Sequence, residues 1–552
     1  RPKTGDMAGT GFLKRLSASF ETGFEAVRNS YLKGVMFFLH HRWLAPVIVV
    51  AGAVLLVYNM KVTKTGLIPQ EDMGVVRVDV STAPGSSLSY TRDVMNRIDR
   101  DVIQDIDEKR AYENSTGFGL VSGSGSSHGS FTIRLKPWDE REGKEHSADA
   151  VIQRIKDYTQ DMNDASIFIS APAMIPGYGA TNGFELYIQD RKGGDVESLF
   201  KVTQDFISEM NQRPEIGSIS TSFNPNFPQF QLDLDPVKCK RAGISPKEVL
   251  SVLNGYYGGQ MSTKFNRFTK LYQVMVQADP SYREDRQSLN NVFVRIGDDM
   301  APISQFVTLT KIYAPESLTR FNLFPCIKVN GRAAEGFSSG EAIQAVREVA
   351  YDTLPVGYGY DFGGIAREEA ESGNNTAIIF LISFVLIYLI LCALYESYLL
   401  PFAVILILPF GLAGSFLLAR AMGLENNIYL QTGLVMLIGL LAKTSILITE
   451  YAVMKRREGL GIAAAALYAT KERFRPIMMT VLTMIVGLFP LVVANGVGAN
   501  GNNTLGAGVI GGMFLGTLGI LFMVPSLFIL FEWLQEKVSP AKFKEQCELA
   551  RK

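Results

Sequence analysis

Apolar residues gather in six runs that are each long enough to cross a lipid bilayer. A membrane-spanning helix needs roughly 20 apolar residues, because the hydrocarbon core is about 30 Å thick. The predicted spans lie at 43–60, 376–395, 399–420, 428–452, 474–495 and 505–533. The first span stands alone, whereas the other five follow one another through short loops. The pattern predicts an α-helical transmembrane bundle.

The polar block after the first span changes to alternating strand and helix patterns. From VVRVDVST to SIFISAPA the order is strand, helix, strand, strand, helix, strand, which predicts a ferredoxin-like βαββαβ unit over 61–187. A second such unit begins near FELYIQD and covers 188–235 and 318–366. An insert at 236–317, with the aromatic glycine turn NGYYGGQ, divides it. We therefore expect an α+β block of two ferredoxin-like units, the second one split.

The two ends of the chain are polar and basic. Residues 1–42 combine a linker with an amphipathic pattern over 11–39, which predicts a helix lying on the membrane surface or, alternatively, a solvated linker helix. The five later spans occupy 367–533, and 534–552 forms a basic tail. The chain begins without methionine in a polar stretch, which suggests a start inside a longer protein.

Positive charge predicts the orientation of the spans. Basic residues concentrate before the first span, between the fourth and fifth spans, and in the tail, and these three segments fall on one side of the membrane. By the positive-inside rule that side is cytoplasmic, which puts the α+β block outside the cytoplasm. Lysine plus arginine equals aspartate plus glutamate, 54 each, so the charge gives no support for a nucleic-acid partner. The four cysteines are widely separated and predict neither a zinc site nor a disulfide framework.

Two short motifs resemble nucleotide-binding or catalytic sequences, and the residues favour neither activity. GLLAKT has Ala442 where a phosphate-binding loop needs glycine. GFSSG matches a nucleophile elbow at Ser338, but Ser338 and Glu341 also form a capping box before a helix, and the second half of the chain has no histidine. A third stretch, the Gly/Ser-rich 115–131, is predicted to be a mobile loop.

Lys443 lies inside the fourth span, roughly ten residues from its cytoplasmic end. A lysine at such a depth costs about 2.5–3.5 kcal/mol on insertion scales, so it needs a partner or water. Thr480 in the fifth span lies at a similar depth, and Arg473 stands at the cytoplasmic mouth. None of the six spans contains an aspartate. We therefore expect the counter-charge on another segment; a neutral lysine is the alternative.

The membrane motifs carry a family resemblance. GLLAKTSILITEYA, RFRPIMMTVLTMIVGLFPL and GAGVIGGMF resemble the C-terminal half of a resistance-nodulation-division (RND) efflux pump of the hydrophobe/amphiphile type. The resemblance implies half of a twelve-span fold, a homotrimer, and the inner membrane of a Gram-negative bacterium. It also implies that an aspartate pair in the N-terminal half faces Lys443. Thr480, Arg473 and Thr444 would take part in the same proton relay.

The resemblance extends to the α+β block. Its two units would be porter subdomains that line a drug pocket, and the insert would be a docking subdomain for an outer-membrane channel. A periplasmic adaptor protein would complete the assembly. The residues implied for substrate binding are Phe118, Phe131, Glu113, Ser115 and Phe184; for a switch loop, Gly117, Gly119, Leu120 and Gly123; and for docking, Tyr256, Tyr257, Gly258 and Gly259. Glu113, Ser115 and Gly123 depart from the residues of well-known multidrug pumps, which leaves the substrate range open.

The predicted function is export of drugs, detergents, dyes and bile-salt-like molecules, driven by the proton motive force. Such a protein is a secondary transporter and no enzyme, and it needs neither cofactor nor metal. A metal-exporting RND pump is one alternative, but it would use clustered methionine ligands, and none surround Met174. A sterol-sensing receptor of the same topology is the other alternative.

Overall fold

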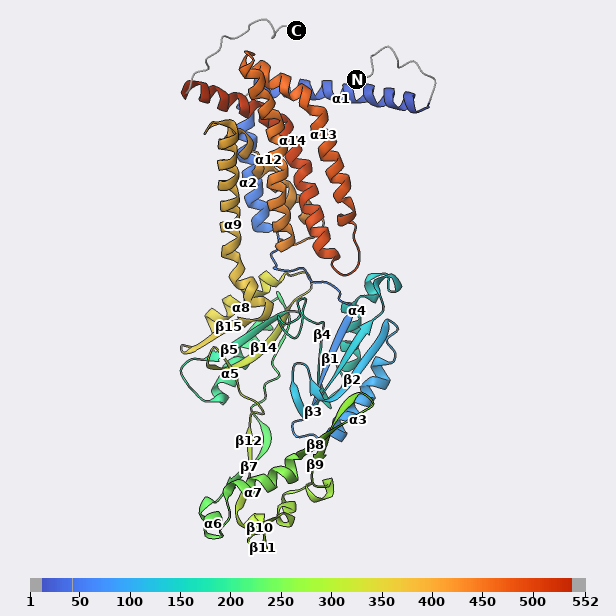
Figure 1. The fold of residues 1–552 in the computed structure, drawn as a ribbon, viewed down its shortest axis with the longest axis vertical. Helices are drawn as coiled ribbons and strands as arrows, with labels where there is room; N and C mark the ends of the chain where they lie inside the picture. The colour runs from blue at the N-terminus through green and yellow to red at the C-terminus, as the bar shows by residue number, and fades with distance from the viewer. Residues whose placement is uncertain (1–11, 42, 539–552) are drawn as a thin grey trace. The chain divides into compact units, whose positions relative to one another are not determined.

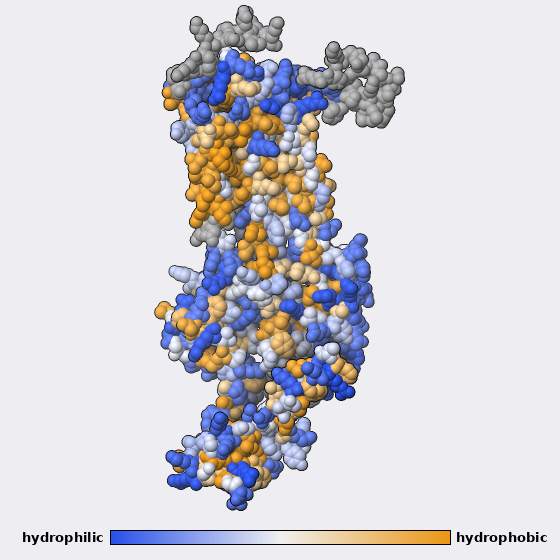
Figure 2. Space-filling model, in the orientation of Figure 1, coloured by the Kyte–Doolittle hydropathy of each residue, from blue (hydrophilic) through white to orange (hydrophobic). Residues whose placement is uncertain are grey.

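The computed structural model describes residues 12–41 and 43–538. Among them, six helices are long and apolar enough to cross a membrane (Figure 1). They comprise α2 (Leu44–Val62), α9 (Gly364–Tyr395), α10 (Pro401–Ile405) followed by α11 (Leu408–Ala421), α12 (Ile428–Arg457), α13 (Ile462–Val492) and α14 (Ala499–Val538). The predicted number of spans is therefore confirmed. Apolar residues cover much of the surface of these helices (Figure 2).

Two spans begin earlier than predicted. Helix α13 starts at Ile462 rather than at 474, and α14 starts at Ala499 rather than at 505. The stretch IAAAALYATKER is not apolar throughout, but its alanines favour helix, so the helix extends beyond the apolar run. The length of an apolar run reflects the thickness of the bilayer core, whereas the helix propensity of the flanking residues determines where the helix begins.

Glycines let three of the spanning helices approach closely. A Cβ atom on Gly414 of α11 would lie 2.5 Å from the carbonyl oxygen of Gly511 in α14. A Cβ on Gly516 would lie 2.6 Å from Leu441 of α12. Small residues are the usual means by which membrane helices bring their backbones together. Helix α12, which carries Lys443, is thereby packed against α14.

The first helix, α1 (Phe12–His40), packs against the spanning helices. The Tyr31 hydroxyl donates to the carbonyl of Leu521 at 2.9 Å, and its ring stacks on Phe474 with centroids 4.4 Å apart. Phe37 on the same helix keeps 54% of its surface exposed. These contacts tie α1 to α13 and α14, which a fully solvated linker helix would not do. The rest of the predicted linker, 1–11, and the tail 539–552 lie outside the described residues.

The first part of the β-rich block contains a four-stranded sheet with two helices. Its elements are β1 (Val75–Thr82), α3 (Leu88–Ile98), β2 (Lys109–Gly119), β3 (Gly123–Leu135), α4 (Ala148–Thr159) and β4 (Ala165–Ser170). The sheet order is β2-β3-β1-β4. Alternate residues of β1, such as Val76 and Val78, are fully buried and pack against Ile98. The period of two seen in VVRVDVST thus produces the buried face.

The predicted mobile loop at 115–131 is wrong. Strands β2 and β3 continue through it as an antiparallel ladder, with a register shift between Thr116 and Phe118. Gly117 has φ of +95° at this shift, a conformation that glycine adopts without strain. The turn is held by Asp79, whose Oδ1 accepts from the Val121 N–H at 3.1 Å. Glycine and serine in the sequence suggested a loop because their pairing with a distant strand cannot be seen locally.

The second sheet belongs to the same compact unit as the first sheet and the spanning helices. Its elements are β5 (Phe184–Asp190), α5 (Val196–Met210), β6 (Ile216–Ser220), β13 (Thr319–Phe321), β14 (Phe324–Ala333), α8 (Ser339–Thr353) and β15 (Tyr358–Gly363). The order is β13-β14-β5-β15, and β6 also pairs with β14. Helix α9 follows β15 directly, so this sheet leads into a span without a loop (Figure 1).

A second compact unit contains residues 82–88 and 223–318. Its elements are β7 (Phe227–Leu234), α6 (Pro236–Arg241), α7 (Pro246–Leu253), β8 (Gln260–Arg267), β9 (Lys270–Val276), β10 (Phe293–Ile296), β11 (Asp299–Pro302) and β12 (Val307–Ala314). Strand β7 pairs with β12 over eight residues, Phe227 to Leu234. The unit therefore begins ahead of the predicted insert at 236–317, because β7 pairs with β12, which lies within that insert.

Candidate functional site

Lys443 lies on the exposed side of α12. Asn427 caps this helix, its Oδ1 accepting from the N–H groups of Tyr429 and Leu430 at 3.0 and 3.1 Å. Lys443 is exposed, while its neighbour Thr444 is buried and donates to the carbonyl of Leu440 at 2.9 Å. Within the described part of the chain, Lys443 makes no hydrogen bond or ion pair. The helix thus presents a lysine, in the middle of a span, to whatever covers this face.

Other exposed polar residues lie on α12 and on α13. Glu450 follows Lys443 by seven residues, which is two helical turns, and it is also exposed. In the adjacent α13, the exposed Thr480 donates to the carbonyl of Pro476 at 2.9 Å. Only 11% of the α13 span is buried, against 67% of α14. An exposed polar face on a membrane helix is costly unless protein or water covers it.

Arg473 is held by an aromatic ring instead of a carboxylate. Its guanidinium lies over the ring of Tyr451 of α12, 4.6 Å from the centroid. Its Nε is buried and finds no hydrogen-bond partner in the described residues. Nearby, Arg456 of α12 forms a two-pronged ion pair with Glu536 of α14 at 2.6 and 3.0 Å. The predicted relay residues Lys443 and Arg473 thus occupy different environments, one open and one packed.

The residues implied for substrate binding lie in three different places. Phe118, near the tip of the β2–β3 hairpin, is 45% exposed, and Glu113 and Ser115 lie on the same strand. Phe131 on β3 is fully buried in the core of the first sheet. Phe184 begins β5 and lines a small cavity that Ser339 also borders. The hairpin holds the switch-loop residues Gly117, Gly119, Leu120 and Gly123, with Leu120 exposed.

The docking residues all lie in the turn after α7. Asn254–Gly258 forms a wide helical turn, and Gly259 has φ of +81°. The Tyr257 hydroxyl bonds to Ser288 at 2.8 Å, and its carbonyl accepts from Gln277 at 2.7 Å. Tyr256 packs against the core of the second compact unit. The aromatic turn is thus part of the folded body of this unit.

Glu369, at the start of α9, is a partly buried carboxylate that no sequence motif indicates. It lines the same cavity as Phe184, and its Oε1 accepts from the Ser339 hydroxyl at 2.8 Å. Burial, with a smaller contribution from the nearby Glu425 carboxylate, raises the pKa of Glu369 to about 7. A single glutamate in a helix has no spacing signature, so only the fold reveals its burial.

Ser338, the residue of the elbow-like motif, caps helix α8. Its hydroxyl accepts from the Glu341 N–H at 3.3 Å, and the Glu341 carboxylate accepts from the Ser338 N–H at 2.8 Å. This is the reciprocal capping box expected from the sequence. The capping interpretation of GFSSG is confirmed.

Comparison with known proteins identifies the family. The model of the AcrB/AcrD/AcrF family matches residues 4–532. The chain is 33% identical over 528 residues to the multidrug/solvent efflux pump membrane transporter MepB of Pseudomonas putida, covering 95% of this chain and 50% of that protein. It is 33% identical over 489 residues to the multidrug export protein AcrF of Escherichia coli, covering 87% and 46%. The toluene efflux pump membrane transporter TtgB of Pseudomonas putida is 32% identical over 528 residues, again 95% and 50%.

The six candidate spans and the β-rich block are compatible with the fold of the RND efflux class. The chain belongs to the AcrB/AcrD/AcrF family. It spans about half the length of the curated relatives it matches.

Proposed function

We propose that this chain takes part in export of hydrophobic and amphiphilic compounds, driven by the proton motive force. The observation that carries the proposal is Lys443, an exposed lysine within a membrane span that has no partner among the described residues. Relatives of this chain are named as multidrug, solvent and toluene efflux pumps, which supports apolar compounds as the exported substrates. A carboxylate outside the described residues would pair with Lys443, and protonation of that carboxylate would release it. Thr480, Thr444 and Arg473 would form the rest of the relay.

The two sheets would act as porter subdomains of ferredoxin-like topology. The strand orders are β2-β3-β1-β4 and β6-β14-β5-β15. In each sheet the first and third of these four strands, counted along the chain, lie at the centre, as in a ferredoxin-like unit. The hairpin with Phe118 and Leu120, together with Glu113 and Ser115, would contact substrate, and so would Phe184 and Phe131 after a rearrangement that exposes the latter. The second compact unit, with Tyr256, Tyr257, Gly258 and Gly259, would be the docking subdomain.

The assembly proposed is a homotrimer in the inner membrane of a Gram-negative bacterium. An N-terminal half with an intramembrane aspartate pair, a periplasmic adaptor and an outer-membrane channel would complete it. The basic segments beside the spans support this orientation, with the β-rich block in the periplasm.

Accumulation of a fluorescent cationic dye in cells with and without the gene tests this function. Cells with the gene should accumulate less dye, and a protonophore should abolish the difference. Equal accumulation in both strains would contradict export and would favour the alternative function of a sterol-sensing receptor. Resistance to copper or silver without dye export would instead indicate a metal pump.

A further inference from the structure

The segment between α2 and β1, residues 63–74, has no helix or strand of its own. We call it the connector. Segments of this kind are usually mobile and loosely held. Here the connector makes three separate sets of hydrogen bonds, each at the beginning of a different helix or pair of helices. All of the residues concerned belong to one compact unit.

The first set joins the connector to α12 and α8. The carbonyl of Lys64 accepts from the Asn426 N–H at 2.8 Å, and that of Leu67 accepts from the Ile428 N–H at 3.1 Å. The carbonyl of Thr65 accepts from the Gly340 N–H in α8, also at 3.1 Å. The helix that carries Lys443 is therefore bound by its first residue to the connector.

There is no spare room at this first attachment. A Cβ atom on Gly66 would lie 2.8 Å from the Glu425 carboxylate and 3.0 Å from the Ser339 hydroxyl. Glu369 of α9 accepts from that hydroxyl, and Lys64 donates to the carbonyl of Gly336. The connector thus fills the space between α8, α9 and the start of α12.

The second set joins the connector to the start of α14. The Glu71 carboxylate accepts from the N–H groups of Gly498 and Gly501, the latter at 3.2 Å. The Gln70 carbonyl accepts from the Asn500 side-chain amide at 2.7 Å. The first N–H groups of a helix lack partners inside the helix, and a carboxylate there also interacts favourably with the helix dipole. Glu71 therefore binds α14 by both charge and hydrogen bonds.

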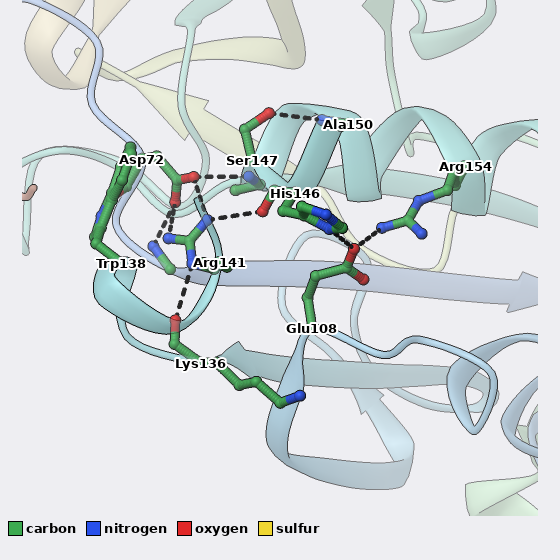
Figure 3. Close-up of polar contacts among 11 residues, drawn as sticks. Asp72, Glu108, Lys136, Trp138, Arg141, His146, Ser147, Ala150 and Arg154 are labelled. Atoms are coloured by element: carbon green, nitrogen blue, oxygen red, sulfur yellow. Dashed lines mark hydrogen bonds and ion pairs between the residues drawn. The ribbon is translucent and has the colours of Figure 1, made fainter. Parts of the chain in front are cut away.

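The third set joins the connector to the first sheet through α4 (Figure 3). The Asp72 carboxylate accepts from Arg141 Nη1 and Nη2 at 2.6 and 2.9 Å, and from the Ala148 N–H at 2.7 Å. The Arg141 side chain is 1% exposed and that of Asp72 is 10% exposed. Burial raises the pKa of Asp72, but the hydrogen bonds from Arg141 and Ala148 outweigh it and hold the pKa below its usual range. A buried, doubly hydrogen-bonded pair of this kind fixes both position and orientation.

We propose that the connector is a coupling strap that transmits displacement of α12 and α14 to both sheets of the β-rich block during export. Eight residues, Lys64 to Glu71, contain the attachments to the two spanning helices, and Asp72 follows immediately. A movement of α12 or α14 along its axis therefore pulls on α4 through Asp72 and on α8 through Thr65. This inference rests on the proposed function and names residues that position the machinery without contacting substrate or protons.

Slackening the strap is the direct test. Two glycines inserted after Ile68 lengthen the chain between the α12 and α14 attachments while leaving every attached residue in place. The same insertion after Gly193 is the matched control, because it lengthens a turn between β5 and α5 that is held by hydrogen bonds to the Asp190 carboxylate and contains no attachment to a spanning helix. The Ile68 insertion should lower dye export by roughly fivefold or more, the usual size of a coupling between distant sites. Export equal to that of the control insertion would overturn the proposal.

A second pair of variants keeps the test decisive if the Ile68 insertion fails to fold. Glu71→Gln has one acceptor oxygen fewer at the start of α14 and should lower export, whereas Glu335→Gln, at an exposed loop position, should not.

Bridging Gln70→Cys to Asn500→Cys with a short bis-maleimide should leave export intact, because the strap stays attached throughout. Loss of export on bridging, with each single cysteine variant active, would show that this contact has to open and would refute the strap. Absence of export by the unmodified protein would count against the proposed function instead.

Discussion

At the scale of single residues, Lys443 and Glu369 illustrate what local pattern does and does not reveal. A lysine within an apolar run is visible in the sequence, and the structure places it on an exposed helix face without a partner in the described residues. Glu369 lies in an ordinary polar stretch, and its burial depends on residues such as Ser339 and Glu425 that are distant in the chain. Burial of a carboxylate by tertiary packing leaves no local signature.

The raised pKa of Glu369 predicts a specific dependence of stability on pH. The folded protein holds this proton up to about pH 7, whereas an unfolded chain loses it near 4.5. Between these values the folded state binds more protons, so stability falls as pH rises. In the Glu369→Gln variant this side chain is neutral at every pH. The variant should therefore lack up to about 3 kcal/mol of the fall in unfolding free energy between pH 5 and pH 8. Thermal unfolding at pH 5 and pH 8 measures the effect.

The exposed neighbour Glu368 supplies the control for this experiment. Glu368→Gln should keep the pH dependence of the unmodified protein. If Glu369→Gln also kept it, Glu369 would be ionised in the folded protein at both pH values, and its burial would carry no electrostatic cost.

At the scale of elements, strand and helix order was more predictable than the ends of elements. Buried strands such as β1 and β5 have clear patterns, because each of their faces packs against fixed neighbours. The hairpin after Thr116 has the composition of a loop, since its glycines pair with a strand whose register the sequence does not display. The start of α13 does not coincide with the start of the apolar run, because an alanine-rich helix can continue beyond the bilayer core.

Close packing of α11 on α14 makes a second prediction. Gly414→Ala places a methyl group 2.5 Å from the backbone oxygen of Gly511, which cannot rotate away. We expect a loss of about 1–3 kcal/mol, as for other overpacked cores. Gly439→Ala in α12 meets no atom within 4 Å and should be neutral or slightly stabilising. Thermal unfolding in detergent compares the two, and equal unfolding temperatures would contradict the packing argument.

At the scale of the whole molecule, six spans and a β-rich block were predictable because apolar length and strand alternation are strong signals. The connector was not predictable. Glu71 meets Gly498 and Gly501 more than 400 residues along the chain, and Asp72 meets Arg141, which is 69 residues away. Such contacts explain how a membrane helix bearing Lys443 is joined to sheets that carry the candidate substrate residues.

The most direct test of the proposed function is dye export driven by an imposed pH gradient in membrane vesicles that contain this protein. Lys443→Met should abolish this export while leaving the protein's abundance and assembly unchanged, because the exposed charge in α12 is lost without disturbing a packed residue. Lys455→Met is the matched control, since Lys455 lies at the end of the same helix and pairs with Glu458 at 2.7 Å; it should export normally. Export by the Lys443→Met protein at the rate of this control would contradict the account.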